Sequence, residues 1–302
     1  MSATRLAAAL AALTIALAAL PGCGGGDGSQ KPAPRRGPMI TIGTKNFPEQ
    51  FVLGELYKQA HERAGYRVAL KSNIGSSEIV DRALTAGSLD MYPEYTGVVL
   101  SEIAGKRARP RSAEQAYREA KRFEERRGFT LLARTPFSNS NALATTPAYA
   151  RRHHLRSIGD LGGLSGVEIG APPEFRTRFE GLVGLRQAYG LRGVAVKPIK
   201  IGEQYRALAA GKVAVALVFT TDGQLGEGRY AVLSDPRRLF AFQNVAPVIR
   251  ARLVRRDPRV ARVLDGVSSR LTTVAMRKMN AAVSLQGQRP AAVAERFLKA
   301  SR

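Results

Sequence analysis

The chain has 302 residues, and its 47 lysines and arginines against 24 aspartates and glutamates give a formal net charge of +23. This length and a hydrophobic fraction of 44% allow one large domain or two ordinary ones, each with a core. A single cysteine excludes an intramolecular disulfide framework and a zinc site built on paired cysteines, and three histidines do not favour a histidine-built metal centre. The composition therefore predicts no metal site and no cofactor.

The first segment reads as an export signal. Arg5 precedes the apolar run 6–20, whose fifteen residues are too few to cross a bilayer core of about 30 Å as a helix. A basic start before such a run is typical of a secretory signal. The run ends in Leu20-Pro21-Gly22-Cys23, which resembles the lipobox of bacterial lipoproteins, in which the cysteine is acylated and becomes the new N-terminus. The alternative is an ordinary secretory signal followed by an unmodified cysteine.

A spacer follows the signal. Residues 24–38 (GGGDGSQKPAPRRGP) contain no large apolar side chain and no periodicity, so they predict a flexible tether. No later stretch reaches 18 apolar residues. We therefore expect a signal peptide over residues 1–22 and a lipid-anchored tether over 23–38. The folded part is expected to be extracytoplasmic, in the periplasm or at the outer face, and held to the cell membrane through Cys23.

From residue 39 on, β-rich runs alternate with helical patterns. Strands are expected at residues 39–43, 68–70, 89–92, 141–145, 167–171, 194–197 and 213–219. Helices are expected at 48–63, from a cap at 75–77 with Ile79, Val80 and Leu84 buried, at 112–127, and from near 148, 179, 203, 258, 272 and 290. This alternation predicts βαβ units and largely parallel sheets. Ligands bind beyond the carboxyl ends of such strands, which points to the loops after Ile42, Tyr92 and Phe219.

Enzyme signatures are missing from the sequence. It contains neither a GxxxxGK[ST] phosphate loop nor a GxSxG nucleophile elbow, and His153-His154 lie among arginines rather than beside a nucleophile. The basic pairs are scattered without interleaved aromatic residues, which disfavours nucleic-acid binding. The sequence therefore predicts a protein that is not an enzyme, with a solvated basic surface drawn to anionic lipid heads or cell wall.

Short motifs follow one another along the folded part. They are 42–50 (IGTKNFPEQ), 73–77 (NIGSS), 89–97 (LDMYPEYTG), 174–175 (EF), Gly181, 184–185 (GL), 188–190 (AYG), Gly202 with 205–208 (YRAL), 219–223 (FTTDG) and 246–250 (APVIR). This ordered set is similar to the substrate-binding proteins of osmoprotectant ABC importers, the glycine betaine and choline binding lipoproteins.

The resemblance implies an α/β, bilobal type II periplasmic-binding-protein fold with a ligand cleft between two α/β lobes. Lobe 1 is expected to comprise residues 39–136 plus 244–302, and lobe 2 residues 137–243. The implied function is an extracytoplasmic solute-binding lipoprotein that passes a small amine or zwitterion, such as a glycine betaine- or choline-like osmoprotectant, to an ABC permease. The protein is expected to be a monomer. The alternative is an enzyme or a sensor module on the same bilobal fold.

The resemblance also implies where the ligand binds. Positions that carry four cage tyrosines in well-known osmoprotectant binders are occupied here by Tyr95, Asn141, Phe219 and Gln243. Aromatic faces attract a quaternary ammonium, and the two amides instead supply hydrogen-bond donors and acceptors. Val98 stands where the family usually has a polar threonine or aspartate.

The anionic end of a ligand requires donors. Lys45, after the first strand, and Ser76, at the next helix start with Ser77, are the candidates for a ligand carboxylate. The expected ligand is therefore a small zwitterion, with choline bound weakly. The alternatives are structural: Tyr95 packs under its turn, Phe219 belongs to the core, Asn141 and Gln243 satisfy backbone groups, and Lys45 stays at the surface. Core packing is expected for Tyr205 and a turn cap for Asp222.

Overall fold

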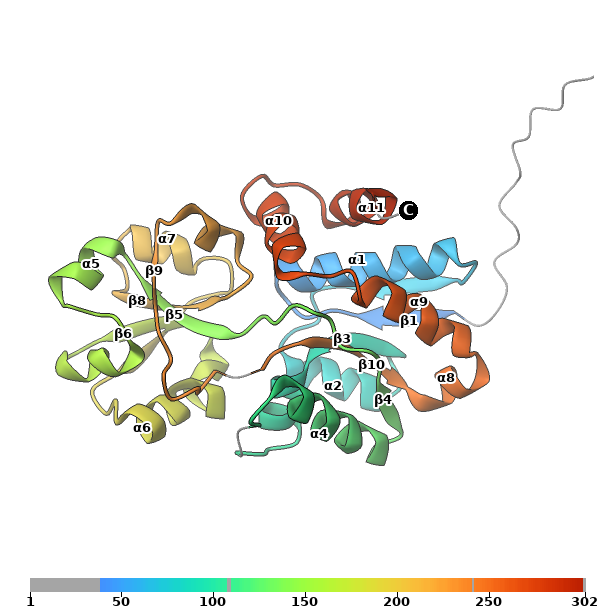
Figure 1. Cartoon of the computed structure of the whole chain (residues 1–302), viewed down its shortest axis with the longest axis horizontal. Coiled ribbons are helices and arrows are strands. Elements are labelled where there is room, and N and C mark those ends of the chain that lie inside the picture. The colour runs from blue at the N-terminus through green and yellow to red at the C-terminus, as the bar shows by residue number, and fades with distance from the viewer. Residues whose placement is uncertain (1–38, 108–109, 241, 301–302) are drawn as a thin grey trace, which may run out of the picture. The chain divides into compact units, whose positions relative to one another are not determined.

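The β-rich runs pair into two sheets. The computed structural model describes residues 39–107, 110–240 and 242–300, and within them sheet 1 has the order β2-β1-β3-β10-β4 and sheet 2 the order β7-β6-β8-β5-β9 (Figure 1). The expected signal peptide, Cys23 and the whole of the expected tether lie outside these residues. The strands are β1 Ile40–Gly43, β2 Val68–Lys71, β3 Met91–Tyr95, β4 Phe129–Leu131, β5 Asn141–Thr145, β6 Glu168–Ala171, β7 Ala195–Pro198, β8 Val215–Phe219, β9 Ala231–Leu233 and β10 Val245–Arg250.

Helices connect most of these strands and close the chain. They are α1 Pro48–Arg63, α2 Ser77–Thr85, α3 Thr96–Val98, α4 Ala113–Arg126, α5 Pro147–Arg152, α6 Gly184–Tyr189, α7 Gln204–Ala209, α8 Ala251–Arg256, α9 Pro258–Ser268, α10 Thr273–Ser284 and α11 Pro290–Ala300. Shorter turns of π or 3₁₀ helix occur at Val99–Ile103, Ile158–Gly163, Pro173–Arg176, Phe179–Val183 and Gly223–Glu227. No helix of the described chain is long and apolar enough to span a bilayer.

Local signals account for several helix ends. Pro48 occupies the first turn of α1, where its missing N–H costs nothing. The Ser112 hydroxyl accepts a hydrogen bond from the Gln115 N–H at 3.1 Å and caps α4, as predicted. In α2, Val80 and Leu84 are buried, but the expectation for Ile79 is wrong because 41% of this residue is exposed. Ile79 instead lies beside the glycine turn that precedes the helix, where a Cβ atom on Gly75 would lie 2.8 Å from its Cδ1 atom.

The expectation of largely parallel sheets is only half right. In sheet 1, β1 runs parallel to β2 and β3, whereas β10 runs antiparallel to β3 and β4. In sheet 2, β6 runs parallel to β7 and β8, whereas β5 runs antiparallel to β8 and β9. The antiparallel strands β5 and β10 are the two by which the chain enters sheet 2 and returns to sheet 1. Each of these two strands comes from the other sheet and not from a crossover helix. Such a helix is the usual connection between two parallel strands of one sheet.

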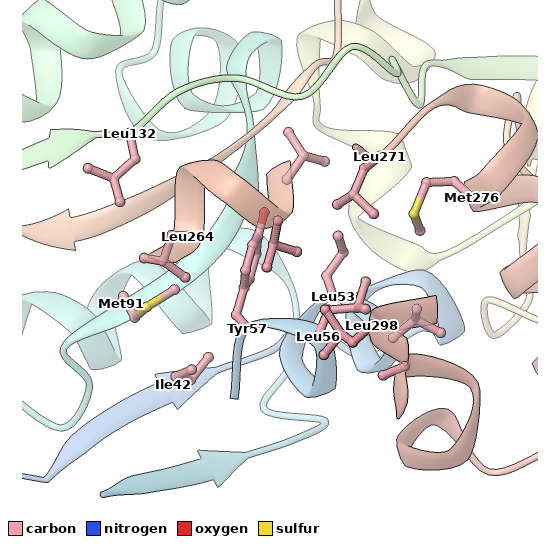
Figure 2. Packing of buried hydrophobic residues seen from close by; sticks show 14 of the residues in the cluster. Ile42, Leu53, Leu56, Tyr57, Met91, Leu132, Leu264, Leu271, Met276 and Leu298 are labelled. Carbon is pink, nitrogen blue, oxygen red and sulfur yellow. The ribbon is translucent and has the colours of Figure 1, made fainter. Parts of the chain in front are cut away.

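Sheet 1 is buried on both faces. One face packs against α1, α9, α10 and α11 in the cluster drawn in Figure 2, to which β3 contributes Met91 and Tyr95. The other face packs against α2 and α4, and there β3 contributes Tyr92. The alternation follows from the two-residue repeat of a strand. Labelled members of the first cluster are Ile42, Leu53, Leu56, Tyr57, Met91, Leu132, Leu264, Leu271, Met276 and Leu298.

Two prolines stand opposite each other in the middle of sheet 1. Pro93 of β3 pairs with Pro247 of β10, so neither residue has an N–H to offer. The Leu132 N–H donates to the Pro247 carbonyl at 3.0 Å. The Leu132 carbonyl cannot accept a hydrogen bond in return, because Pro247 has no N–H, and it accepts from the Tyr117 hydroxyl at 3.1 Å instead. A side chain of α4 thus completes the hydrogen bonding that the strand lacks.

Two crossing segments carry the chain between the sheets, after β4 and after β9. They pair through an antiparallel bridge between Ser138 and Asn244, and the Asn139 N–H donates to the Gln243 carbonyl at 3.0 Å. The Asn244 side chain donates to the carbonyls of Thr135 and Phe137 at 3.0 Å each. Both sheets belong to one compact unit.

Candidate functional site

A cavity of about 690 Å³, its mouth included, lies between the two sheets. The structure brings all of the sequence-predicted ligand residues to its wall, namely Lys45, Ser76, Tyr95, Asn141, Phe219 and Gln243. They come from the loop after β1, the start of α2, the end of β3, the start of β5, the end of β8 and the second crossing segment. The carboxyl ends of β1, β3 and β8 therefore converge on the cavity, as the strand-end rule predicts.

Three aromatic rings line one side of this cavity. Phe47 lies between Tyr95 and Phe219, with ring centroids 6.3 Å and 5.6 Å away and interplanar angles of 21° and 10°. Sequence reasoning did not select Phe47, although it stands within the first quoted motif. Its place between two selected residues becomes visible only when β1, β3 and β8 are brought together. The rings give the cavity an apolar wall that attracts cations.

Lys45 is buried beside the rings and differs from its expected role in one respect. Its ammonium donates to Glu94 Oε1 at 2.5 Å and to Ser77 Oγ at 3.1 Å, so its charge already has a counter-ion. The same nitrogen lies 4.1 Å from the centroid of the Tyr95 ring. Burial lowers the pKa of Lys45, and the Glu94 carboxylate opposes that shift. An ammonium this deep requires such a partner, which the sequence did not point out.

A second ion-pair group lies at the cavity and connects the two lobes. Arg178, between β6 and α6, pairs with Glu78 of α2 at 2.8 Å and with Glu102 at 3.6 Å. Burial raises the pKa of Glu102. Arg178 and Glu102 line the cavity and were not selected from the sequence. No motif marks them, because the partners are far apart in the sequence. Glu78 lies 100 positions before Arg178, and Glu102 also belongs to the other lobe.

The buried carboxyl group of Glu180 lines the cavity. The Gln243 amide donates to Glu180 Oε2 at 2.7 Å, and its oxygen accepts from the Val98 N–H at 3.1 Å. The Asn141 amide donates to the Glu180 carbonyl at 3.3 Å. Burial raises the pKa of Glu180 to about 8, so this group is mostly uncharged at neutral pH. Both selected amides therefore have protein partners while they also line the cavity.

Behind the aromatic wall, one carboxylate joins both lobes. Glu49 of α1 is 3% exposed and accepts hydrogen bonds from four described side chains. Oε1 accepts from Tyr95 at 2.8 Å and Asn139 at 2.9 Å, and Oε2 accepts from Thr221 at 2.5 Å and Asn280 at 2.8 Å. We call these five residues the Glu49 clasp. Through it the Tyr95 ring, the first crossing segment, the loop after β8 and α10 share one anchor.

The remaining selected residues have structural contacts. The Ser76 hydroxyl donates to Glu78 Oε2 at 2.6 Å. Tyr205 is buried against sheet 2, and its hydroxyl donates to Asp222 Oδ2 at 2.7 Å. Asp222 also accepts from the Phe219 N–H at 3.0 Å, and burial raises its pKa to about 7. Asp222 therefore holds the turn that positions Phe219, and neither Tyr205 nor Asp222 lines the main cavity.

Two α/β lobes joined by two crossing segments, with a polar and aromatic cavity between them, define a solute-binding protein of the bilobal periplasmic type. The chain belongs to a particular family of this class: the family model described as the substrate binding domain of the ABC-type glycine betaine transport system matches residues 38–300. The resemblance inferred from the ordered motifs is thus confirmed, as is the bilobal α/β fold. The chain is the substrate-binding component of an ABC transport system of this type.

Individual relatives agree with this assignment. The glycine-betaine-binding protein of Pseudomonas aeruginosa is 32% identical over 275 residues, which cover 86% of this chain and 87% of that protein. The glycine betaine-binding protein YehZ of Escherichia coli is 28% identical over 283 residues, covering 86% of this chain and 90% of the relative. A crystal structure titled as a glycine betaine/carnitine/choline ABC transporter superposes with a TM-score of 0.69 at 26% identity, covering 86% of this chain and 97% of the other.

Proposed function

We propose that the cavity binds a small zwitterion with a methylated ammonium and a carboxylate, of the glycine betaine class, for delivery to an ABC permease. The observation that carries this proposal is the wall of three rings, Phe47, Tyr95 and Phe219, beside a buried ammonium. A quaternary ammonium has no N–H to donate and is attracted to aromatic faces, by about 2 kcal/mol per ring when desolvated. The relatives named for glycine betaine and the family description support the same ligand class.

Lys45 is proposed to receive the carboxylate. An ammonium has three donors, and two of these meet Glu94 and Ser77 among the described residues. The third can join a ligand carboxylate, with the Ser76 hydroxyl nearby on the cavity wall. Asn141 and Gln243 are proposed to hydrogen-bond the polar edge of the ligand beside the uncharged Glu180. Choline lacks the carboxylate and is expected to bind more weakly than a betaine.

The proposed lobes follow the expected boundaries, with lobe 1 at residues 39–136 plus 244–302 and lobe 2 at 137–243. The membership of the two sheets supports them, since β10 returns to sheet 1 after β9. Closure of the lobes over the ligand would remove water from its contacts and create the surface that the permease reads. Arg178 and its two carboxylate partners would then serve as the cross-lobe contact nearest the ligand.

The protein is further proposed to be a monomer that acts outside the cytoplasmic membrane, without enzymatic activity, and is anchored by acylation of Cys23. The apolar run 6–20 and the tether sequence support the anchor. Two hydrocarbon chains on the cysteine would suffice for stable attachment. Cys23→Ser should release the protein from membranes washed in high salt, which removes attraction by charge alone. Retention of the variant under those conditions would contradict the anchor.

Calorimetry with glycine betaine, choline, ergothioneine and amino acids tests the ligand. Tyr95→Ala should weaken glycine betaine binding by about 2 kcal/mol, whereas Tyr149→Ala, which removes a half-buried ring of α5 outside the cavity, should not. Tighter binding of choline than of every carboxylate-bearing ligand would overturn the proposed ligand class.

A double variant isolates the role of Lys45. Because Lys45 alone cannot be removed without leaving Glu94 buried and unpaired, Lys45→Met is combined with Glu94→Gln. This variant should lose affinity for glycine betaine and keep its affinity for choline. Equal losses for both ligands, or no loss for either, would show that Lys45 does not receive the carboxylate.

A further inference from the structure

The arginines of α8 and α9 form a basic surface that the binding function does not use. Residues 251–262 (ARLVRRDPRVAR) contain five arginines and one acid. Arg252, Arg255 and Arg256 are three and four positions apart, so they occupy one side of α8, and all are exposed. None of the six residues of α8 is buried, although Leu253 and Val254 pack against the core.

The surface continues on α9 and reaches the start of the folded chain. Arg259 and Arg262 are exposed, while Val260 and Leu264 on the other side of α9 are buried. The Tyr66 hydroxyl donates to Asp257 at 2.6 Å and accepts from Arg259 Nε at 2.9 Å. These bonds hold the α8–α9 junction beside Arg67, whose carbonyl accepts from the Ile40 N–H at 2.9 Å.

The described chain therefore begins next to this basic surface, which we define as Arg67, Arg252, Arg255, Arg256, Arg259 and Arg262. Figure 1 shows α8 and α9 at the same end of the fold as the beginning of β1. Asp257 is the acid between the two helices, and it is already engaged by Tyr66 and Arg259. Within the described residues 251–262, Asp257 is thus the one acid available to five arginines, so most of their charge is not neutralised by this segment.

We propose that this basic surface binds the anionic headgroups of a phospholipid bilayer. Its charge is complementary to such a membrane, where each arginine near the surface strengthens binding by about fivefold. The choice of a bilayer over another polyanion rests on the proposed attachment through Cys23, since a chain tied to the membrane ahead of Met39 brings this face to it. Binding here would leave the cavity, which is lined by other elements, unobstructed.

Vesicle binding of the expected mature chain tests the proposal. All proteins begin at residue 23, as the expected mature chain does, and carry Cys23→Ser, so that neither the apolar run 6–20 nor an acyl group contributes. They are mixed with vesicles of phosphatidylcholine alone or with about 30% phosphatidylglycerol. The parent should bind the anionic vesicles at least several hundredfold more tightly, with the difference shrinking in high salt. Changing Arg252, Arg255, Arg256 and Arg262 to Gln should remove most of that preference, by about one hundredfold or more.

A matched control separates this surface from net charge. Changing Arg151, Arg152, Arg156 and Arg192 to Gln removes four exposed charges from lobe 2 and should leave most of the preference intact. Equal losses in both variants, or no preference in the parent, would overturn the proposal. So would tighter binding to soluble polyphosphate that depends on the same four arginines, which would identify a soluble polyanion as the partner. Glycine betaine titrations of the same proteins report ligand binding separately, so failure of one proposal is distinguishable from failure of the other.

Discussion

Replacing one carboxylate oxygen of Glu49 should lower the free energy of unfolding, because the Glu49 clasp connects both lobes through the two oxygens of this side chain. In Glu49→Gln, one carboxylate oxygen becomes an NH₂ group that faces one hydroxyl and one asparagine amide, whichever way the new amide is turned. The hydroxyl can rotate to accept, but the asparagine N–H loses its acceptor, at a cost of about 1–3 kcal/mol. The remaining bonds also lose their charge assistance. We expect a loss of about 3 kcal/mol in the free energy of unfolding, or roughly 6–12 °C in Tm.

Urea and thermal unfolding of the variant measure this loss. Glu114→Gln is the control, because this carboxylate is exposed and its surface ion pairs with Arg118 and Arg134 should together contribute no more than about 1 kcal/mol. A double-mutant cycle with Thr221→Val then measures the coupling between lobes. In the Glu49→Gln background, Thr221→Val should cost less than it does alone. A Glu49→Gln variant as stable as wild type, or two strictly additive substitutions, would refute the clasp.

Two further predictions concern the inner side of the cavity. Burial raises the pKa of Glu180 to about 8, so the folded protein keeps a proton that the unfolded chain releases above about pH 4.3. The stability contributed by this group is present below that pH and is lost as the pH rises towards 8. Glu180→Gln should therefore flatten the fall of Tm between pH 5 and 8, and an unchanged profile would show that Glu180 is not the group responsible. At Gly97, a Cβ atom would lie 2.5 Å from the Gln243 amide nitrogen. Gly97→Ala should displace that amide from its hydrogen bonds with Glu180 and the Val98 N–H. The substitution should therefore weaken ligand binding in calorimetry and cost about 1–3 kcal/mol in stability, whereas Gly226→Ala, in open space, should have none of these effects.

The limits of sequence reasoning are clearest at the two prolines of sheet 1. The third strand was predicted to end at Tyr92, one residue before Pro93, and no strand was predicted around Pro247. Proline is normally excluded from central strands because it cannot donate to the ladder. Here the two prolines face each other and the Tyr117 hydroxyl satisfies the carbonyl left over. That compensation depends on three segments distant in sequence, so local propensity disfavours a strand that the tertiary structure allows.

Some residues of the site could likewise be predicted from the sequence, and others could not. Tyr95 and Phe219 end strands whose carboxyl ends meet, so strand order and the family motifs suffice to place them on one cavity. Phe47 and Arg178 could not be selected in this way. Phe47 is identified by the rings on either side of it, and Arg178 by carboxylates on the other lobe. Local signals, by contrast, predicted the start of α1 to the residue, because Pro48 marks its first turn.

The topology of the sheets also sets an order of folding during synthesis. Sheet 2 is built from strands between residues 141 and 233, so its members emerge from the ribosome consecutively. In sheet 1, β4 adjoins the rest of the sheet through β10, and the face against α1 is completed by α9, α10 and α11. The first lobe to begin emerging is therefore the last that can be completed. Its apolar surface stays uncovered until almost the whole chain has been made, and a chain that stops before α9 lacks the cover for that face.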